Sequence, residues 1–443
     1  MDARQDWWAR PGQPLRGRVQ VPGDKSVSHR ALMLGALAEG VTAVRGFLES
    51  ADTIATARIL GQLGVRIEAP SEGERRIHGV GLHGLQAPSG PLDCGNSGTG
   101  MRLLAGLLAG QAFDSELLGD ASLSMRPMGR VVEPLERMGA CITAAPGGVP
   151  PLRVQGGRRL HGTGHALPVA SAQVKSALLL AGLYAEGATE VVEPRPTRDY
   201  TERMLAAFGW PVEYAAGHAR LTGGHRLRAT AVEVPGDFSS AAFFLVAASV
   251  VPGSELWLAN VGLDPRRTGL LQALRLMGAD IEVHERREQG GSVVGDLRVR
   301  HARLSGIEVP EALVPDMIDE FPALFAAAAC ADGPTVVRGA AELRVKESDR
   351  IAAMARGLRV LGATVGETPD GACIQGPLSA GGTVEGVGDH RIAMALAVAA
   401  QCTPAPVRVR DVANVATSFP GFAALAVECG MGLDAALAPS RRD

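Results

Sequence analysis

Two kinds of apolar segment alternate along the 443-residue chain. In the first kind, a polar head precedes a run rich in Ala, Leu and Val that is apolar almost all round, as is typical of a helix buried inside a domain. The heads recur at nearly equal intervals, at Asp24, Asn96, Ser171, Asp237, Asp316 and Asp389. The six segments read DKSVSHRALMLGALAEG, NSGTGMRLLAGLLAG, SAQVKSALLLAGLYAEG, DFSSAAFFLVAASVVPG, DMIDEFPALFAAAACADG and DHRIAMALAVAAQ.

The second kind is an amphipathic helix that ends at a glycine and in most cases runs into a strand. A glycine in this place predicts a left-handed helix C-cap. The capping glycines are Gly64, Gly139, Gly209, Gly278, Gly362 and Gly430. Two series with the same period predict a sixfold repeat, each unit containing two helices and short strands. Segments such as RIHGVGL, LRVQGG and ELWLANVG have the pattern of the strands, so we expect an α/β fold.

The phrase VPGD predicts where the chain divides. It occurs at Val21–Asp24 and at Val234–Asp237, each time before a helix of the first kind and three repeats apart. The stretch before Asp24 and the stretch after Asp389 together amount to about one repeat, so both chain ends complete one unit. We therefore expect a discontinuous domain, 1–23 with 237–443, and an inserted domain, 24–236, with hinge crossovers near 21–24 and 234–237.

Composition narrows the class of partner. The net charge is −3, and aromatic side chains make up only 4% of the chain, which argues against a surface that binds nucleic acid. The six scattered cysteines show no metal-ligand spacing and suit a reducing compartment. The first residues lack a signal-peptide layout, and the apolar runs are shorter than the roughly 20 residues that span a bilayer. We expect a cytoplasmic protein without metal or cofactor.

The polar heads predict anion binding. A helix N-terminus carries unpaired N–H groups and a partial positive charge, so several that converge in a cleft between domains would attract anions. Asp24 separates Gly23 from Lys25, which excludes the phosphate loop of nucleotide-binding proteins. A lone Asp or Ser in a head is ordinarily a plain cap, yet basic residues there oppose the dipole, as Lys25, Arg30, Arg102, Lys175 and Arg391 do.

Arginines also recur at a nearly constant distance before the capping glycines, at Arg126, Arg198, Arg267 and Arg350. This set predicts a site for one or two substrates with several negative charges, because Arg forks match carboxylate and phosphate. Acid/base candidates lie in PDMIDEF, with Asp316, Asp319 and Glu320, and in RVKESDR, with Lys346, Glu347 and Asp349. Taken singly, these charges also fit a solvated face.

At these residues the sequence resembles the enolpyruvyl transferases, and among them the branch that acts on shikimate 3-phosphate. The motifs DKSVSHR, GNSGTGMR, MRPM, SAQVKSA, RVKESDR and GDHR follow in order over nearly the whole chain, which is specific as a set. The resemblance implies a two-domain inside-out α/β barrel of six βαβαββ units, three per domain, with buried helices. It implies transfer of the enolpyruvyl group of phosphoenolpyruvate to the 5-hydroxyl, release of phosphate, and a monomer.

The resemblance also implies roles for particular residues. Shikimate 3-phosphate is expected at Lys25, Ser26, Arg30, Ser171, Ala172, Gln173, Arg198, Asp319 and Lys346. Phosphoenolpyruvate is expected at Lys25, Asn96, Gly98, Arg126, Gln173, Arg350 and Arg391. Asp319 is expected to accept the proton of the 5-hydroxyl, Glu347 to exchange the proton at C3, and Lys25 to act as an acid toward the departing phosphate. Two positions depart from some members: Ala172 replaces a Ser, and Thr417 replaces a Lys that binds phosphoenolpyruvate.

Three alternatives stay open at this stage. The sister enzyme that acts on UDP-N-acetylglucosamine uses a Cys in the loop that here reads GDASLSMRPM, which contains none. A ring or clamp of six units around DNA would need a basic inner surface, and the near-neutral charge disfavours it. A binding protein without turnover is distinguished only by an assay.

Overall fold

The computed structural model describes residues 5–289 and 292–434, and the chain within it divides into two compact units. Unit 1 combines the N-terminal segment up to Pro22 with Pro235–Glu288 and the residues from Ser292 onward, and unit 2 is built on Gly23–Val234. Residues 1–4, 290–291 and 435–443 of the expected discontinuous domain lie outside the described residues. Within the described part, no helix is long and apolar enough to cross a membrane.

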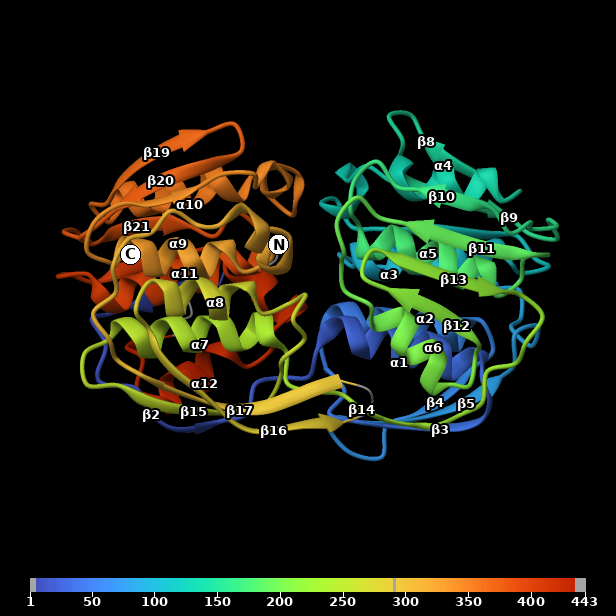
Figure 1. The fold of residues 1–443 in the computed structure, drawn as a ribbon, viewed down its shortest axis with the longest axis horizontal. Coiled ribbons are helices and arrows are strands. Elements are labelled where there is room, and N and C mark those ends of the chain that lie inside the picture. The colour runs from blue at the N-terminus through green and yellow to red at the C-terminus, as the bar shows by residue number, and fades with distance from the viewer. Residues whose placement is uncertain (1–4, 290–291, 435–443) are drawn as a thin grey trace, which may run out of the picture. The chain divides into compact units, whose positions relative to one another are not determined.

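The apolar segments form the buried helices. In α7, all 13 residues are buried, as the absence of a polar face requires. Each unit has its own apolar core around three such helices, which lie between its sheets (Figure 1). In unit 2 they are α1 (Lys25–Leu37), α3 (Gly98–Ala109) and α5 (Ala172–Gly182); in unit 1 they are α7 (Phe238–Val250), α9 (Phe321–Ala329) and α11 (His390–Ala399).

The second series forms helices that keep one exposed side. They are α2 (Ala51–Gln62), α4 (Gly129–Arg137), α6 (Tyr200–Ala207), α8 (Gly269–Leu276), α10 (Arg350–Val360) and α12 (Phe422–Glu428). All six predicted capping glycines have φ between +82° and +106°, so the prediction of left-handed C-caps is confirmed. A strand follows each of these glycines, because the left-handed residue turns the chain out of the helix.

Six small sheets complete the described fold, and most contain one parallel pair. Unit 2 holds β14-β3-β5-β4, β6-β7-β9-β8 and β10-β11-β13-β12. Their bounds are β3 (Glu39–Arg45), β4 (Arg66–Glu68), β5 (Glu74–Val80), β6 (Leu92–Asp93), β7 (Ser115–Leu118), β8 (Cys141–Ala145), β9 (Val149–Gln155), β10 (Gly164–Ala166), β11 (Ala188–Val192), β12 (Val212–Ala215), β13 (His218–Thr222) and β14 (Ala231–Glu233).

Unit 1 holds β21-β22-β1-β23, β16-β17-β15-β2 and β18-β20-β19. The N-terminal strand β1 pairs with β22 and β23 near the other end of the chain, with Trp7 opposite Val409 and Trp8 opposite Asp434. The bounds are β1 (Trp7–Ala9), β2 (Arg16–Val19), β15 (Glu255–Gly262), β16 (Asp280–Gln289), β17 (Ser292–Arg300), β18 (Thr335–Val337), β19 (Thr364–Thr368), β20 (Gly371–Gln375), β21 (Gly382–Glu385), β22 (Val407–Arg410) and β23 (Leu433–Asp434).

The mixed α/β class is confirmed, whereas two predicted helix heads are wrong in detail. The N-cap of α3 is Ser97 rather than Asn96, and its hydroxyl accepts from the Gly100 N–H. Asp316 lies in a short 3-10 turn, η3 (Pro315–Met317), and α9 starts only at Phe321. The reason is Pro322, which lacks an N–H and is tolerated only in the first turn of a helix.

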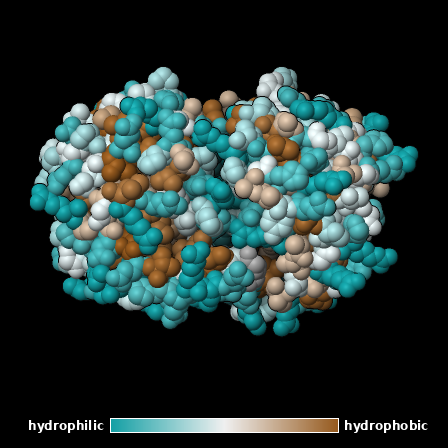
Figure 2. All heavy atoms as spheres, in the orientation of Figure 1, coloured by the Kyte–Doolittle hydropathy of each residue, from teal (hydrophilic) through white to brown (hydrophobic). Residues whose placement is uncertain are grey.

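The outer surface is mostly polar, and the large apolar side chains left exposed lie on strands and in turns as well as on helices of the second series. Leu276 at the end of α8 is 57% exposed, for example. Figure 2 shows larger apolar areas on the visible face of unit 1 than on that of unit 2. Exposed apolar residues that occur singly are normal on folded domains.

Candidate functional site

The first head of unit 2 pairs a lysine with a carboxylate. Asp24 caps α1 by accepting from the Val27 N–H at 2.9 Å. Lys25 follows in the first turn, and its Nζ lies 3.0 Å from Oδ2 of Asp52 at the start of α2. The Lys25 side chain is 19% exposed and that of Asp52 only 8%, so the carboxylate can orient an ammonium group that still reaches solvent. Ser26 beside it is half-buried.

Arg30 is buried one turn further along α1. Its Nε donates to Thr201 Oγ1 at 2.7 Å and its Nη2 to Ser176 Oγ at 2.7 Å. Burial, followed by the charge of Arg198, lowers the pKa of Arg30 to about 10. Two guanidinium groups close enough to repel each other favour an anion nearby, because an anion relieves that repulsion.

His29 joins the starts of the buried helices. Its Nδ1 lies 2.9 Å from Thr56 Oγ1 and its Nε2 3.4 Å from Ser97 Oγ, at the cap of α3. Burial lowers its pKa to about 3, with further contributions from Lys25 and Arg30. The ring is therefore neutral at pH 7 and adds no charge beside Lys25.

The second head brings Asn96 and Arg126 together. Asn96 Oδ1 accepts from Arg126 Nη2 at 2.7 Å, and Asn96 Nδ2 donates to Asp120 Oδ2 at 2.7 Å. A Cβ added to Gly98 would lie 3.0 Å from Arg102 Nη1 and 3.1 Å from Arg126 Nη1. A side chain at position 98 would therefore require these guanidinium groups to shift.

The third head, at the start of α5, is tied to the second. Gln173 Nε2 donates to Thr99 Oγ1 at 2.9 Å, and Gln173 Oε1 accepts from Arg102 at 3.0 Å. Ser171 caps the helix through the Val174 N–H, and Ala172 is its first residue. The three helix starts of unit 2 therefore converge, as the anion-binding hypothesis requires within a unit.

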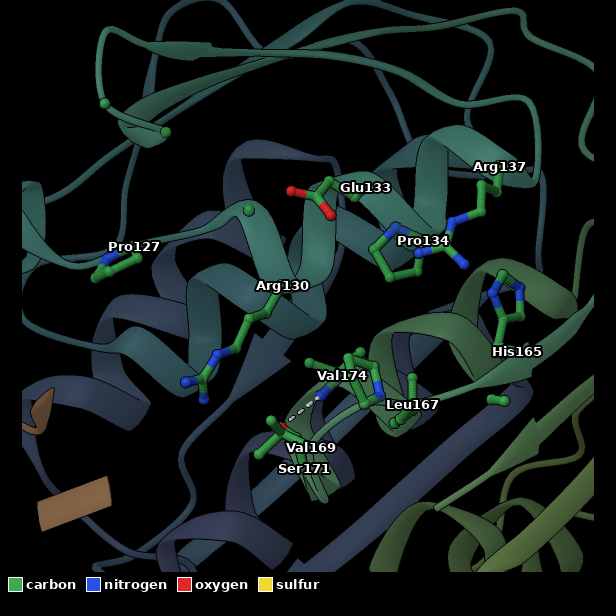
Figure 3. A pocket seen from close by; sticks show the side chains of 15 residues that line it. Pro127, Arg130, Glu133, Pro134, Arg137, His165, Leu167, Val169, Ser171 and Val174 are labelled. Carbon is green, nitrogen blue, oxygen red and sulfur yellow. Dashed lines mark hydrogen bonds between the residues drawn. The ribbon is translucent and has the colours of Figure 1, made fainter. Parts of the chain in front are cut away.

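A pocket of about 390 Å³ opens in unit 2 beside the start of α5, and Figure 3 shows the residues that line it. Arg130, Glu133 and Arg137 of α4 form one wall, and the segment from His165 to Val169 forms another. Of the predicted site residues in the described chain, Ser171 alone lines it. The pocket therefore adjoins the third head without containing the rest of the predicted set.

The structure contradicts the prediction that Lys175 is one of the anion-binding cations. Its side chain is 3% exposed, and its Nζ lies 2.8 Å from Glu193 Oε2 and 2.8 Å from Glu202 Oε1. Burial acts to lower its pKa, but Glu202 and Glu193 outweigh this effect and raise it. The positive charge of Lys175 is compensated inside the protein.

Unit 1 gathers cations around Asp319. Its carboxylate lies 3.5 Å from Arg267 Nη1, 3.6 Å from Lys346 Nζ and 3.6 Å from Arg350 Nη1, and 17% of its side chain is exposed. Arg391 Nη1 donates to the Asp319 carbonyl at 2.9 Å. Four cations therefore surround the expected proton acceptor, and an anionic substrate there would meet a positive environment.

Arg350 connects this cluster to the interior. It is 1% exposed, its Nε donates to Asp389 Oδ2 at 2.8 Å, and its Nη2 lies 2.5 Å from Glu347 Oε2. Asp389 caps α11 through the Arg391 N–H at 3.0 Å. Arg350 thus fixes the predicted C3 proton carrier, Glu347, and the start of α11 at once.

The helix starts of unit 1 also converge. Ser239 in the first turn of α7 donates to Glu320 at the N-cap of α9, and Arg391 of α11 lies 3.6 Å from the same carboxylate. Burial raises the pKa of Glu320, against the charges of Arg267 and Arg391. For Asp237 burial acts in the same direction, but Arg267 and Arg391 outweigh it and the pKa is lowered.

Some residues of these sets carry no local signal in the sequence. Asp52 lies on an amphipathic helix, far along the chain from Lys25, and nothing in its surroundings distinguishes it from a solvated acid. Glu193 follows strand β11 with no motif around it. A search for a carboxylate near each basic head would have produced many candidates, because the chain contains 47 Asp and Glu.

Arg350→Met is expected to lower the free energy of unfolding by about 3–5 kcal/mol, because it leaves Asp389 buried without its cation. Arg359→Met is the matched control on the same helix, since Arg359 forms a more exposed pair with Glu367, 3.0 Å away. For the control we expect a loss of about 1 kcal/mol or less. Urea unfolding followed by circular dichroism measures both, and equal shifts of the midpoint would contradict the importance of the buried pair.

Comparisons with known proteins agree on one family. A family model described as EPSP synthase (3-phosphoshikimate 1-carboxyvinyltransferase) matches residues 9–425. The chain is 65% identical over 430 residues to the 3-phosphoshikimate 1-carboxyvinyltransferase of Xanthomonas oryzae pv. oryzae (strain PXO99A), covering 97% of this chain and 98% of that protein. It is 65% identical over 434 residues to that of Xanthomonas campestris pv. campestris (strain 8004), covering 98% and 99%. A solved structure of EPSP synthase from Acinetobacter baumannii matches with a TM-score of 0.88 and 50% identity, covering 97% and 99%.

Proposed function

Because the chain belongs to the EPSP synthase family, we infer that it transfers the enolpyruvyl group of phosphoenolpyruvate to the 5-hydroxyl of shikimate 3-phosphate. Phosphate is released, and the product continues in the shikimate pathway toward chorismate and the aromatic amino acids. The family match over residues 9–425 carries this conclusion. The clusters of Lys and Arg in both units support it, because both substrates carry several negative charges.

We propose that unit 2 supplies most of the contacts to the substrate phosphates and carboxylates. Shikimate 3-phosphate would contact residues of the first and third heads with the segment before α6: Lys25, Ser26, Arg30, Ser171, Ala172, Gln173 and Arg198. Phosphoenolpyruvate would contact Lys25, Gln173 and residues of the second head: Asn96, Gly98 and Arg126. The convergence of the three helix starts and the two neighbouring guanidinium groups of Arg30 and Arg198 support this assignment.

Unit 1 would supply the proton chemistry. Asp319 takes the proton of the 5-hydroxyl as its oxygen attacks C2 of phosphoenolpyruvate, and C3 gains a proton from Glu347. The tetrahedral adduct then loses phosphate, to which Lys25 donates a proton, while the Glu347 carboxylate takes back one proton from C3. Lys346 holds the 5-hydroxyl beside Asp319, while Arg350 and Arg391 bind phosphoenolpyruvate. The 3.6 Å separations from Asp319 to Lys346 and to Arg350 support these neighbouring roles.

We further propose that the units are the domains of a two-domain inside-out α/β barrel with six βαβαββ units. The domains would be 1–23 with 237–443, and 24–236, with hinges near 21–24 and 234–237. The unit bounds at Pro22/Gly23 and Val234/Pro235, three sheets in each unit, and the pairing of β1 with β22 support this description. The cytoplasmic location and the monomeric state stay predictions.

Phosphate release is expected only when shikimate 3-phosphate and phosphoenolpyruvate are both present. A coupled assay for inorganic phosphate measures this, with each substrate alone as the control. Turnover of UDP-N-acetylglucosamine in place of shikimate 3-phosphate would overturn the assignment, and binding of both substrates without phosphate release would indicate a binding protein.

A further inference from the structure

A buried carboxylate joins two segments of the proposed shikimate 3-phosphate subsite. Glu193 follows β11, and none of its side chain is exposed. Its Oε1 accepts from the Ser171 N–H at 3.1 Å and from Thr197 Oγ1 at 2.7 Å. Its Oε2 accepts from Lys175 Nζ at 2.8 Å and from the Thr197 N–H at 3.3 Å. All these partners are donors, which is the environment that an ionised carboxylate requires.

The two segments that Glu193 holds carry most of the proposed contacts of this subsite. Ser171 begins the segment that continues through Ala172 and Gln173, and Thr197 immediately precedes Arg198. Because Glu193 is fully buried, it cannot contact the substrate itself. It can only fix the positions of residues that do, and its hydrogen bonds to two backbone N–H groups fix main-chain atoms as well as side chains.

Lys175 explains how an acidic residue can lie beneath an anion site. A carboxylate bonded to the Ser171 N–H would repel a phosphate bound at Ser171, unless a cation compensated it. Lys175 lies between Glu193 and Glu202, and the charge of Glu202 in turn acts to raise the pKa of Arg30. Lys175 therefore compensates the charge of Glu193, and the positive field at the subsite comes from Arg30, Arg198 and the helix start.

We propose that Glu193, neutralised by Lys175, is a positioning residue of the shikimate 3-phosphate subsite: it holds the 171–173 and 197–198 segments in register for the substrate phosphate. This inference rests on the proposed function. Phosphoenolpyruvate contacts, apart from Gln173, lie on other segments. The structure therefore assigns to Glu193 an effect on the affinity for one substrate rather than on the affinity for both.

The test compares Glu193→Gln and Lys175→Met with the wild-type chain by calorimetric titration of shikimate 3-phosphate and by phosphate release. For Glu193→Gln we expect the Kd and KM for shikimate 3-phosphate to rise by about 10- to 100-fold, the scale of one or two lost charge-assisted hydrogen bonds. The kcat at saturation and the KM for phosphoenolpyruvate should change by less than about 3-fold. Lys175→Met should raise the Kd further, because the carboxylate stays without its cation.

Asp6→Asn is the matched control in unit 1. Asp6 also accepts from a backbone N–H, that of Asp411 at 3.2 Å, and from a guanidinium group, that of Arg408 at 2.6 Å. It should lower stability without changing the Kd for shikimate 3-phosphate. If Glu193→Gln does not fold, Thr197→Val removes the hydroxyl that bonds to Glu193, leaves the charges of Glu193, Lys175 and Glu202 in place, and is expected to fold and to bind the substrate weakly.

Two failures are distinguishable. An inactive wild-type chain would overturn the proposed function and this inference with it. An active wild-type chain whose folded Glu193→Gln variant, or folded Thr197→Val variant, binds shikimate 3-phosphate within about 2-fold of normal would overturn the positioning role alone. A purely structural role would lower the melting temperature and the active fraction, while the Kd of the remaining folded protein stayed unchanged.

Discussion

Lys25→Ala is expected to lower kcat by about 10³-fold or more while the chain stays folded. The ammonium group of Lys25 would stabilise charge on both substrates and protonate the departing phosphate, and removal of either kind of contribution ordinarily costs about 10²- to 10⁴-fold. The variant should fold, because Lys25 is partly exposed and a single ion pair is lost, although the loss of a cation beside Asp52, whose side chain is only 8% exposed, is expected to lower its stability. Phosphate release and circular dichroism measure the two effects separately.

Arg58→Ala is the control for this experiment. Arg58 lies on α2, the helix that also carries Asp52, and it pairs with Asp93 in an exposed contact of 3.2 Å. Its loss should leave kcat unchanged, because it takes no part in the proposed site. A folded Lys25→Ala variant with near-normal kcat would refute the role given to Lys25.

Asp319→Asn should lower kcat by about 10²- to 10⁴-fold, because the amide keeps the shape of the side chain but cannot accept the proton of the 5-hydroxyl. The three cations within 3.6 Å of the carboxylate lose a counter-charge in this variant, so tighter binding of the anionic substrates is expected beside the loss of turnover. Steady-state phosphate release gives kcat, and titration with phosphoenolpyruvate in the presence of shikimate 3-phosphate gives the affinity.

The neighbouring Asp316→Asn variant tests whether the position or merely the acidity matters. Asp316 lies one turn earlier in the chain and pairs with Arg266 at 3.4 Å. Burial raises its pKa, against the charge of Arg266, so it resembles a catalytic acid in that respect. We nevertheless expect near-normal kcat, because Asp316 lies outside the proposed site. Equal losses for both variants would contradict the assignment of Asp319.

The repeat was predictable because it depends on local chemistry. Gly64 and the five other capping glycines are readable in the sequence, since a left-handed residue after an amphipathic helix suits glycine above all. The start of α9 was misplaced because a head of three acids, Asp316, Asp319 and Glu320, offers several possible caps. The proline at position 322 decides between them, and a start at Asp316 leaves it too deep inside the helix.

The residues of the site that lie in sequence motifs were predictable. The ion pairs between residues that are distant in the sequence were not predictable. The sequence suggested that Lys175 binds an anionic substrate, because its partners, Glu193 and Glu202, lie further along the chain and outside its motif. Asp52 was missed for the same reason. An ion pair brought together by the tertiary fold has no periodicity, so only coordinates distinguish a compensated charge from one that faces a ligand.

The pairing of β1 with β22 and β23 has a consequence for biosynthesis. All strands of unit 2 lie in one continuous stretch of chain, so it can fold as soon as Val234 has left the ribosome. Unit 1 must wait, because Trp8 finds its partner Asp434 only at the other end of the polypeptide. At about 5–20 residues per second, the nascent N-terminal strand stays without that partner for on the order of 20–90 s. Chaperones that shield extended apolar segments are therefore expected to assist the folding of unit 1 more than that of unit 2. In stalled nascent chains, unit 2 is expected to become resistant to protease before unit 1.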